Sequence, residues 1–322
     1  MFKLKQYYNQ NRKKIWTCVL LVIFLFGILQ LLNYLEKNKS NTKDISNSST
    51  NSTTITATTD KTQKKQTSAV NDYIISKNTA DENEKIIKDF IEACNNGETS
   101  KAYALLSSDC KEVLYPTEEE FIKNYYRPIF AEKKICDLQS WLVDGRKYTY
   151  KVTIASDILS TGQASNSTQQ TDYITIIDEE DEKKLNINSY VCRKNVKGTT
   201  TRDNIQITVN YKDVYIEYEK YNISIKNKSK NIIMLDNKEN SKTIYLVDDS
   251  EVKYSAYVHE ISKGLLIFKP QQKRTMNIKF NKGYETEKVI KNMHFTNVIT
   301  DYEKYVEDKE NYEDIKQIIV GL

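Results

Sequence analysis

The sequence predicts one transmembrane helix, then an α+β domain, then an all-β sandwich. Three observations carry this prediction: an uncharged run of 18 residues near the N-terminus, a switch from helical to alternating periodicity near residue 147, and a dense series of short apolar segments after residue 204. The predicted parts are a basic tail (1–14), an anchor (15–35), a linker (36–80), an α+β domain (81–198) and a β domain (199–322).

Residues 15–32 carry the membrane prediction, because their 18 uncharged side chains would form a helix about 27 Å long. The hydrocarbon core of a bilayer is about 30 Å thick. Five basic residues and no acidic residue precede this run, which predicts a cytoplasmic N-terminus. No small-residue cleavage site follows it, so we expect an uncleaved signal anchor, a single-pass protein in the cell membrane, and extracytoplasmic C-terminal domains.

The net charge of +4 does not indicate a nucleic-acid partner. Five positive charges lie in the tail, so the rest of the chain holds 43 basic and 44 acidic residues. No basic patch that would follow a phosphate backbone is predicted. The segment from residue 36 to 70 draws 19 of its 35 residues from Ser, Thr and Asn, which predicts a disordered tether.

Residues 82–131 have the periodicity of three helices. The second is expected from about Thr99 to Pro116, and Thr117 with Glu120 forms a capping box that opens the third. The first places four apolar residues on one face: Ile87, Phe90, Ile91 and Cys94.

Alternating periodicity then indicates strands at 148–154, 173–177 and 185–191. From residue 204, seven or eight short strands in about 90 residues are typical of a β-sandwich of the immunoglobulin-like class. The acidic segment 301–314 is expected to be a solvated helix or sheet edge.

The sequence offers no catalytic residue, cofactor site or metal site that we would assign. The α+β domain contains no histidine, and His259 and His294 in the β domain lack ligand-like spacing. No nucleotide-binding, nucleophile-elbow or zinc-protease motif occurs. Unpaired thiols are favoured, with one disulfide left open, for the extracytoplasmic cysteines Cys94, Cys110, Cys136 and Cys192.

A cavity in the α+β domain would be the natural place for a ligand. Asp157 and Asp172 flank strands and could face inward, although carboxylates solvated beside turns are the favoured interpretation. Tyr150 and Trp141 are expected to be core or rim aromatics first and pocket walls second. The candidate cavity-lining residues are therefore Trp141, Tyr150, Asp157 and Asp172.

Two resemblances accompany these patterns. Residues 82–195, through segments 90–96, 101–106 and 120–122 and the three strands, resemble a nuclear-transport-factor-2-like domain, a cone of three helices closing a bent sheet. Residues 204–300, through segments 221–227, 266–270 and 276–280, resemble the immunoglobulin-like extracellular domains of Gram-positive lipoproteins. The anchor, tether and cone together are distantly similar to TcpC-like components of Gram-positive conjugation machinery.

We therefore expect a non-enzymatic binding or scaffold protein of the cell envelope, with a secretion or conjugation assembly as one setting. Its expected partners are the membrane, through residues 15–35, and other envelope proteins, and self-association is left open. One alternative is a small-ligand sensor or enzyme that uses the cone cavity. Another is a cell-wall or polysaccharide-binding module, which predicts coplanar exposed aromatics such as Tyr215, Tyr218 and Tyr221.

Overall fold

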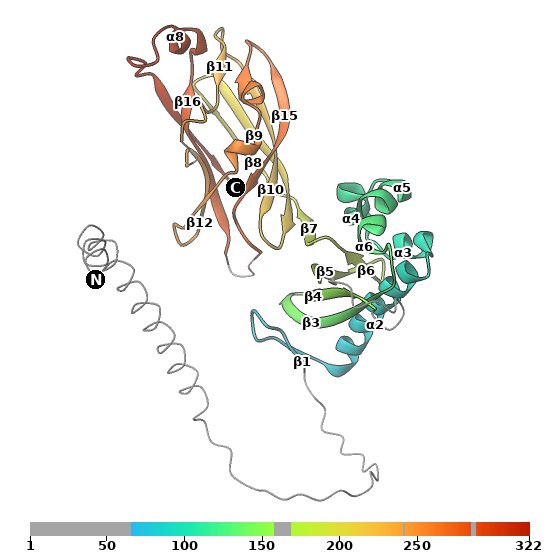
Figure 1. The fold of residues 1–322 in the computed structure, drawn as a ribbon. Helices are drawn as coiled ribbons and strands as arrows, with labels where there is room; N and C mark the ends of the chain where they lie inside the picture. The colour runs from blue at the N-terminus through green and yellow to red at the C-terminus, as the bar shows by residue number, and fades with distance from the viewer. Residues whose placement is uncertain (1–65, 158–168, 241, 285–287) are drawn as a thin grey trace, which may run out of the picture. The chain divides into compact units, whose positions relative to one another are not determined.

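The computed structural model describes residues 66–157, 169–240, 242–284 and 288–322. Helices gather against a small sheet in the N-terminal part of this region, which we call the helical domain (Figure 1). From residue 190 onward the chain forms two packed sheets, which we call the sandwich (Figure 1).

The predicted fold class is wrong in its first part. No helix among the described residues is long and apolar enough to cross a membrane, and these residues are mostly β-sheet. The longest helix of the described part of the chain, α2 (Lys77–Asn95), has 19 residues but carries charged side chains along its exposed face. The predicted anchor (15–35), the basic tail and most of the linker lie outside the described residues.

Helix α2 confirms the predicted first helix and extends it toward the N-terminus. It begins at Ser76, whose hydroxyl accepts a hydrogen bond from the Thr79 backbone N–H, and it ends before Gly97, which adopts a φ of 72°. Its buried face includes the four apolar residues expected from periodicity: Ile87, Phe90, Ile91 and Cys94.

The second predicted helix is two helices, α3 (Thr99–Ala104) and α4 (Ser108–Leu114). The backbone leaves the helix between them because it pairs with a strand. The Leu185 N–H donates to the Leu105 carbonyl at 2.9 Å, and the Ser107 N–H donates to the Leu185 carbonyl at 3.0 Å. The third predicted helix opens as expected, with the Thr117 hydroxyl capping Glu120 N–H, and comprises α5 (Glu118–Phe121), a π-helical turn η1 (Ile122–Tyr126) and α6 (Arg127–Ile129).

An antiparallel sheet in the order β3-β4-β5-β6 completes the helical domain. The alternation predicted around residues 148–154 is confirmed, because Tyr150, Val152 and Ile154 are buried on the face toward the helices. A β-bulge at Trp141 interrupts the pairing of the first strand, which the periodicity did not reveal. The strands are β3 (Lys134–Asp144), β4 (Lys147–Ser156), β5 (Gln170–Glu179) and β6 (Glu182–Asn186).

Both predicted boundaries of the helical domain shift. Residues 66–80, assigned to the linker from sequence, carry the hairpin of β1 (Gln66–Thr67) and β2 (Ile74–Ile75) and the start of α2. The hairpin is fastened to β3, since Ala69 N–H and Val70 N–H donate to the Ser140 and Trp141 carbonyls. The predicted strand 185–191 divides, because its second half starts the sandwich.

The first sheet of the sandwich has the order β15-β10-β9-β7, with β8 also on β9. Strand β9 is long and continues to Tyr215, because the turn to β10 begins only after that residue. Outward and inward residues alternate along β10 and along the first half of β9, and the alternation of β9 breaks after Asn210 at a register shift. The strands are β7 (Tyr190–Lys194), β8 (Gly198–Arg202), β9 (Ile205–Tyr215), β10 (Glu219–Asn227) and β15 (Lys273–Phe280).

The second sheet has the order β13-β12-β16-β11-β14, with β17 also on β16. Its inner face joins that of the first sheet in one large apolar core. The acidic segment 301–314, expected to be a solvated helix or sheet edge, contains the short helix α8 (Tyr302–Glu307), in which Tyr305 is buried. The strands are β11 (Ile233–Met234), β12 (Ile244–Asp248), β13 (Lys253–Ser255), β14 (Ile267–Phe268), β16 (Ile290–Ile299) and β17 (Ile315–Gly321).

Two sandwich tyrosines belong to the core of the helical domain. Tyr190 on β7 and Tyr215 on β9 are almost fully buried, and both pack in the cluster that contains Phe90 and Phe121. Their ring centroids lie 5.4 Å apart in an edge-to-face arrangement. The core of one domain is thus completed by strands of the other.

The four described cysteines are unpaired, and their environments predict different reactivities. Burial raises the pKa of the Cys94 and Cys110 thiols to about 12, so almost no thiolate forms at neutral pH. Cys136 is only partly buried. We expect iodoacetamide at pH 8 to modify Cys136 first in the native protein and to leave Cys94 and Cys110 unmodified, as read by peptide mass spectrometry. Equal labelling of all three before denaturant is added would contradict this assignment.

Candidate functional site

The interior of the helical domain, where a ligand cavity was considered, is packed with aromatic rings. Phe121 is the centre of the cluster, with ring centroids 5.7 Å from Tyr115, 5.7 Å from Tyr125 and 6.3 Å from Phe90. Tyr150 is fully buried in the same cluster. These side chains occupy the space between sheet and helices that a bound ligand would need.

Asp172 is a buried structural carboxylate and is not solvated beside a turn. Its side chain accepts hydrogen bonds from the Tyr125 hydroxyl (2.9 Å) and from the backbone N–H groups of Tyr173 (2.7 Å), Asn188 (3.1 Å) and Ser189 (3.0 Å). Burial raises the pKa of Asp172, and these hydrogen bonds oppose that shift. Asn188 and Ser189 adopt the left-handed conformation, with φ values of 58° and 60°. The carboxylate binds the N–H groups of this turn and the Tyr125 hydroxyl at the same time, and so connects the turn to a helix.

The other three candidate residues do not converge with Asp172. Tyr150 faces the helices, and burial raises its pKa to about 12, so it does not transfer protons near neutral pH. Trp141 contacts Tyr173 edge-to-face at 5.3 Å and Lys151 at 5.8 Å, which places it on the opposite face of the sheet. Asp157 follows the end of β4, where its N–H donates to the Lys133 carbonyl.

The sandwich instead presents a broad polar surface on the outer side of its first sheet. Three rows of amide, hydroxyl and ammonium side chains cross strands β8, β9, β10 and β15. We call this surface the polar face and define it by ten residues: Thr199, Gln206, Thr208, Asn210, Asn222, Ser224, Lys226, Lys273, Thr275 and Asn277.

Hydrogen bonds along these rows fix the side chains. In the amide row, Asn210 Nδ2 donates to Asn222 Oδ1 at 2.7 Å, and Asn222 Nδ2 donates to Asn277 Oδ1 at 2.8 Å. In the next row, the hydroxyls of Ser224 and Thr275 are 2.9 Å apart. Asn210 enters the row through a β-bulge, because the pairing of β9 with β10 slips by one residue there. The polar face is therefore ordered before any partner binds.

Two concavities adjoin the polar face. One of about 300 Å³ is lined by Thr208, Asn210, Ser224 and Lys226 among others, and one of about 450 Å³ reaches from Asn210 to Lys197. Among the described residues, the Asn210 Oδ1 and Asn277 Nδ2 atoms have no hydrogen-bond partner. The amide row thus ends in a free acceptor on one side and a free donor on the other.

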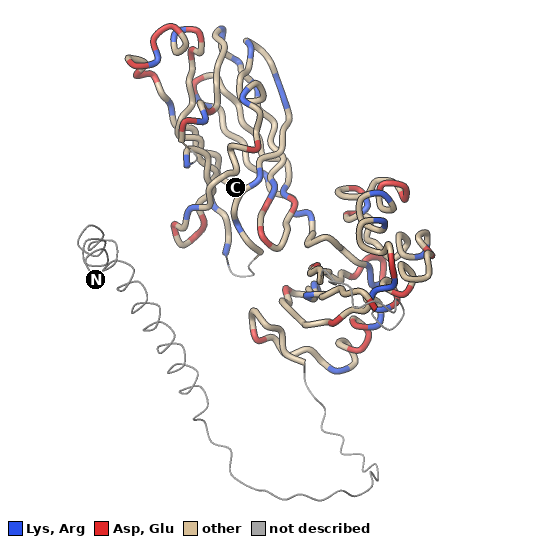
Figure 2. The backbone as a smooth tube through the Cα atoms, in the orientation of Figure 1, with Lys and Arg blue, Asp and Glu red and all other residues tan. Residues whose placement is uncertain are grey.

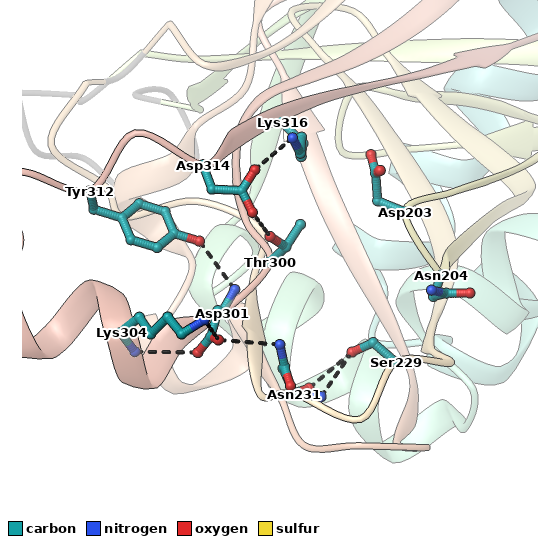
Figure 3. Close-up of a pocket in the computed structure, with 10 residues that line it drawn as sticks. All are labelled: Asp203, Asn204, Ser229, Asn231, Thr300, Asp301, Lys304, Tyr312, Asp314 and Lys316. Carbon is teal, nitrogen blue, oxygen red and sulfur yellow. Dashed lines mark hydrogen bonds and ion pairs between the residues drawn. The ribbon is translucent and has the colours of Figure 1, made fainter.

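A separate concavity of about 350 Å³ lies beside α8 (Figure 3). Four of its five charged side chains are paired with one another: Lys316 contacts Asp314 at 2.5 Å, and Lys304 contacts Asp301 at 3.3 Å. Figure 2 shows the acidic residues of the α8 region gathered at this end of the sandwich. Within the described part of the chain, no group of three or more His, Cys, Asp or Glu side chains could hold a metal ion.

Comparison with known proteins gives no family model, curated protein or solved structure that matches this chain. The resemblances to nuclear-transport-factor-2-like, immunoglobulin-like and TcpC-like proteins therefore stay predictions.

Sequence reasoning looked for a binding surface made of aromatics and missed the polar face. Tyr221 is fully buried, Tyr215 is 3% exposed, and Tyr218 stacks on Tyr215 at 4.4 Å, so these rings form no exposed platform. The missed signal was the run of Asn, Ser and Thr at outward positions of three strands. Only the strand register shows that these positions form continuous rows.

Proposed function

We propose that this chain is a binding and scaffold protein of the cell envelope and that the polar face of the sandwich is its contact surface. The ordered amide row from Asn210 to Asn277 carries the proposal, because it offers fixed donors and acceptors without the entropy cost of ordering them on binding. The envelope setting is supported only by the N-terminal sequence.

A protein partner suits this surface better than a polysaccharide. Sugar rings commonly stack on exposed aromatics, and the tyrosines that could have served are buried or stacked within the fold. Side-chain amides and hydroxyls match the N–H and C=O groups of another polypeptide. The aromatic packing inside the helical domain also disfavours a ligand or catalytic site there.

Site-specific photo-crosslinking tests this proposal in living cells. A photoreactive amino acid in place of Asn277, at the β15 end of the amide row, should give a discrete crosslinked product with an envelope protein. The same amino acid in place of Val252, which is 41% exposed and lies outside the polar face, is the matched control. Adding Asn210→Ala should weaken the product at position 277, because it removes one end of the amide row.

Identical products from positions 277 and 252, or none from position 277, would overturn the proposal. A product that is released by glycan hydrolases and not by proteases would replace the protein partner with a polysaccharide.

A further inference from the structure

A pocket of about 360 Å³ lies at the start of β16, at the opposite end of this strand from the concavity beside α8. It is bounded by the end of β7 and the segment that follows, by β9 and β10, and by the start of β16. Four of its lining side chains are lysines, and none of its lining side chains is acidic: Lys194, Asn195, Val196, Lys197, Lys212, Tyr221, Lys288, Val289, Ile290 and Leu322.

At the pocket wall, the buried carboxylate of Glu219 is shared between the buried Lys282 ammonium and the partly buried ammonium of Lys212, which lines the pocket. Glu219 accepts hydrogen bonds from Lys212 Nζ, with both oxygens at 2.9 Å, and lies 3.3 Å from Lys282 Nζ. The Tyr221 hydroxyl donates to the same carboxylate at 2.8 Å. The side chains of Glu219 and Lys282 are each 3% exposed, and that of Lys212 is 12% exposed. This cluster therefore has one positive charge more than its carboxylate can neutralise.

A surplus charge in such a place is costly unless an anion accompanies it. Burial lowers the pKa of Lys212, and the nearby Lys282 and Lys194 act in the same direction, whereas Glu219 opposes them. A negative charge in the pocket would therefore stabilise the charged form of Lys212.

The rim adds further positive charge. Lys194 and Lys197 are exposed, and within the described residues neither has an ion-pair partner. Lys288 is already paired at 3.8 Å with the buried Asp248. Among the described residues of the pocket and the cluster behind it, five lysines accompany two carboxylates, those of Glu219 and Asp248.

We propose that this pocket binds a phosphate-type oxyanion. Lysines converge on it from three separate segments, so positive charge surrounds an occupant on several sides. Lysine is a compact point charge, and no arginine fork that would favour a planar carboxylate lines the pocket. The volume accommodates a phosphate with a small attached group. The phosphate can be free or part of a larger molecule such as a lipid headgroup.

Isothermal titration of the full-length protein tests this site with inorganic phosphate and with glycerophosphoglycerol, a soluble phosphodiester headgroup. We expect saturable binding of at least one of them at constant ionic strength. The double variant Lys194→Ala/Lys197→Ala should bind about tenfold more weakly, because it removes two charge-assisted contacts. The variant Lys212→Met should also bind more weakly, since it removes the surplus charge and leaves the Lys282–Glu219 pair.

The matched control is Lys263→Ala/Lys269→Ala, which removes the same charge from exposed positions of the sandwich outside the pocket. It should bind like the unmodified protein. Tighter binding of the phosphodiester assigns the site to a headgroup or other esterified phosphate, and tighter binding of inorganic phosphate assigns it to the free ion. Absence of saturable binding to both ligands, or equal losses in the control, overturns the proposal.

Discussion

Replacing Asp172 with alanine should destabilise the helical domain by about 4 kcal/mol, because three backbone N–H groups and the Tyr125 hydroxyl lose their common acceptor. Asp172 is only 4% exposed, so water does not readily reach these donor groups to replace the carboxylate. The turn at Asn188 and Ser189 should loosen as well. Chemical denaturation followed by circular dichroism measures the loss.

Two further variants serve as controls for this substitution. Asp172→Asn should lose less stability than Asp172→Ala. With the amide oxygen in the place of Oδ1, it can still accept hydrogen bonds from the Tyr173 and Ser189 N–H groups. Asp137→Ala, which removes an exposed carboxylate on β3, should change stability by less than about 0.5 kcal/mol. A loss for Asp172→Ala no larger than that for Asp137→Ala would show that Asp172 does not fasten the turn.

Gly198→Ala should destabilise the sandwich by about 2–3 kcal/mol through overpacking. A Cβ at this position on β8 would overlap the backbone carbonyl oxygen of Gly321 on β17 and lie 3.0 Å from the Leu322 Cδ2 atom. A backbone oxygen moves only if β8 and β17 separate, and this contact closes one side of the sandwich. Thermal denaturation reports the change.

Gly264→Ala is the control for this substitution. Nothing lies within 4 Å of a Cβ at Gly264, so the added methyl group has room. If the two alanine variants melted at the same temperature, close packing of β8 on β17 would be excluded.

Local signals in the sequence predicted individual elements well. The four apolar residues of α2 and the Thr117 cap depend on neighbours within a few positions, and the structure bears them out. The break at Leu105 and Leu106 was missed because its cause is β6, about 80 residues away. Strands β3, β8, β16 and β17 were also missed, and register shifts disturb the alternation of β3 and β16.

Candidate site residues were harder to predict than elements. Asp172 was expected beside a turn at the flank of a strand, but it lies within β5 opposite Val152, and its carboxylate is buried against Tyr125 from a helix. The lysine-lined pocket draws its residues from segments separated by nearly a hundred positions. The periodicity of a single segment cannot predict that side chains from distant segments lie together.

We expect the shared tyrosines to couple the unfolding of the two domains. Tyr190 and Tyr215 are held by sandwich strands yet complete the aromatic core around Phe121. Loss of the sandwich would open a void in its neighbour, so the two folds should melt together. They are therefore not interchangeable modules: a domain exchanged at residue 198, the boundary expected from sequence, would leave one of these rings on each side of the junction.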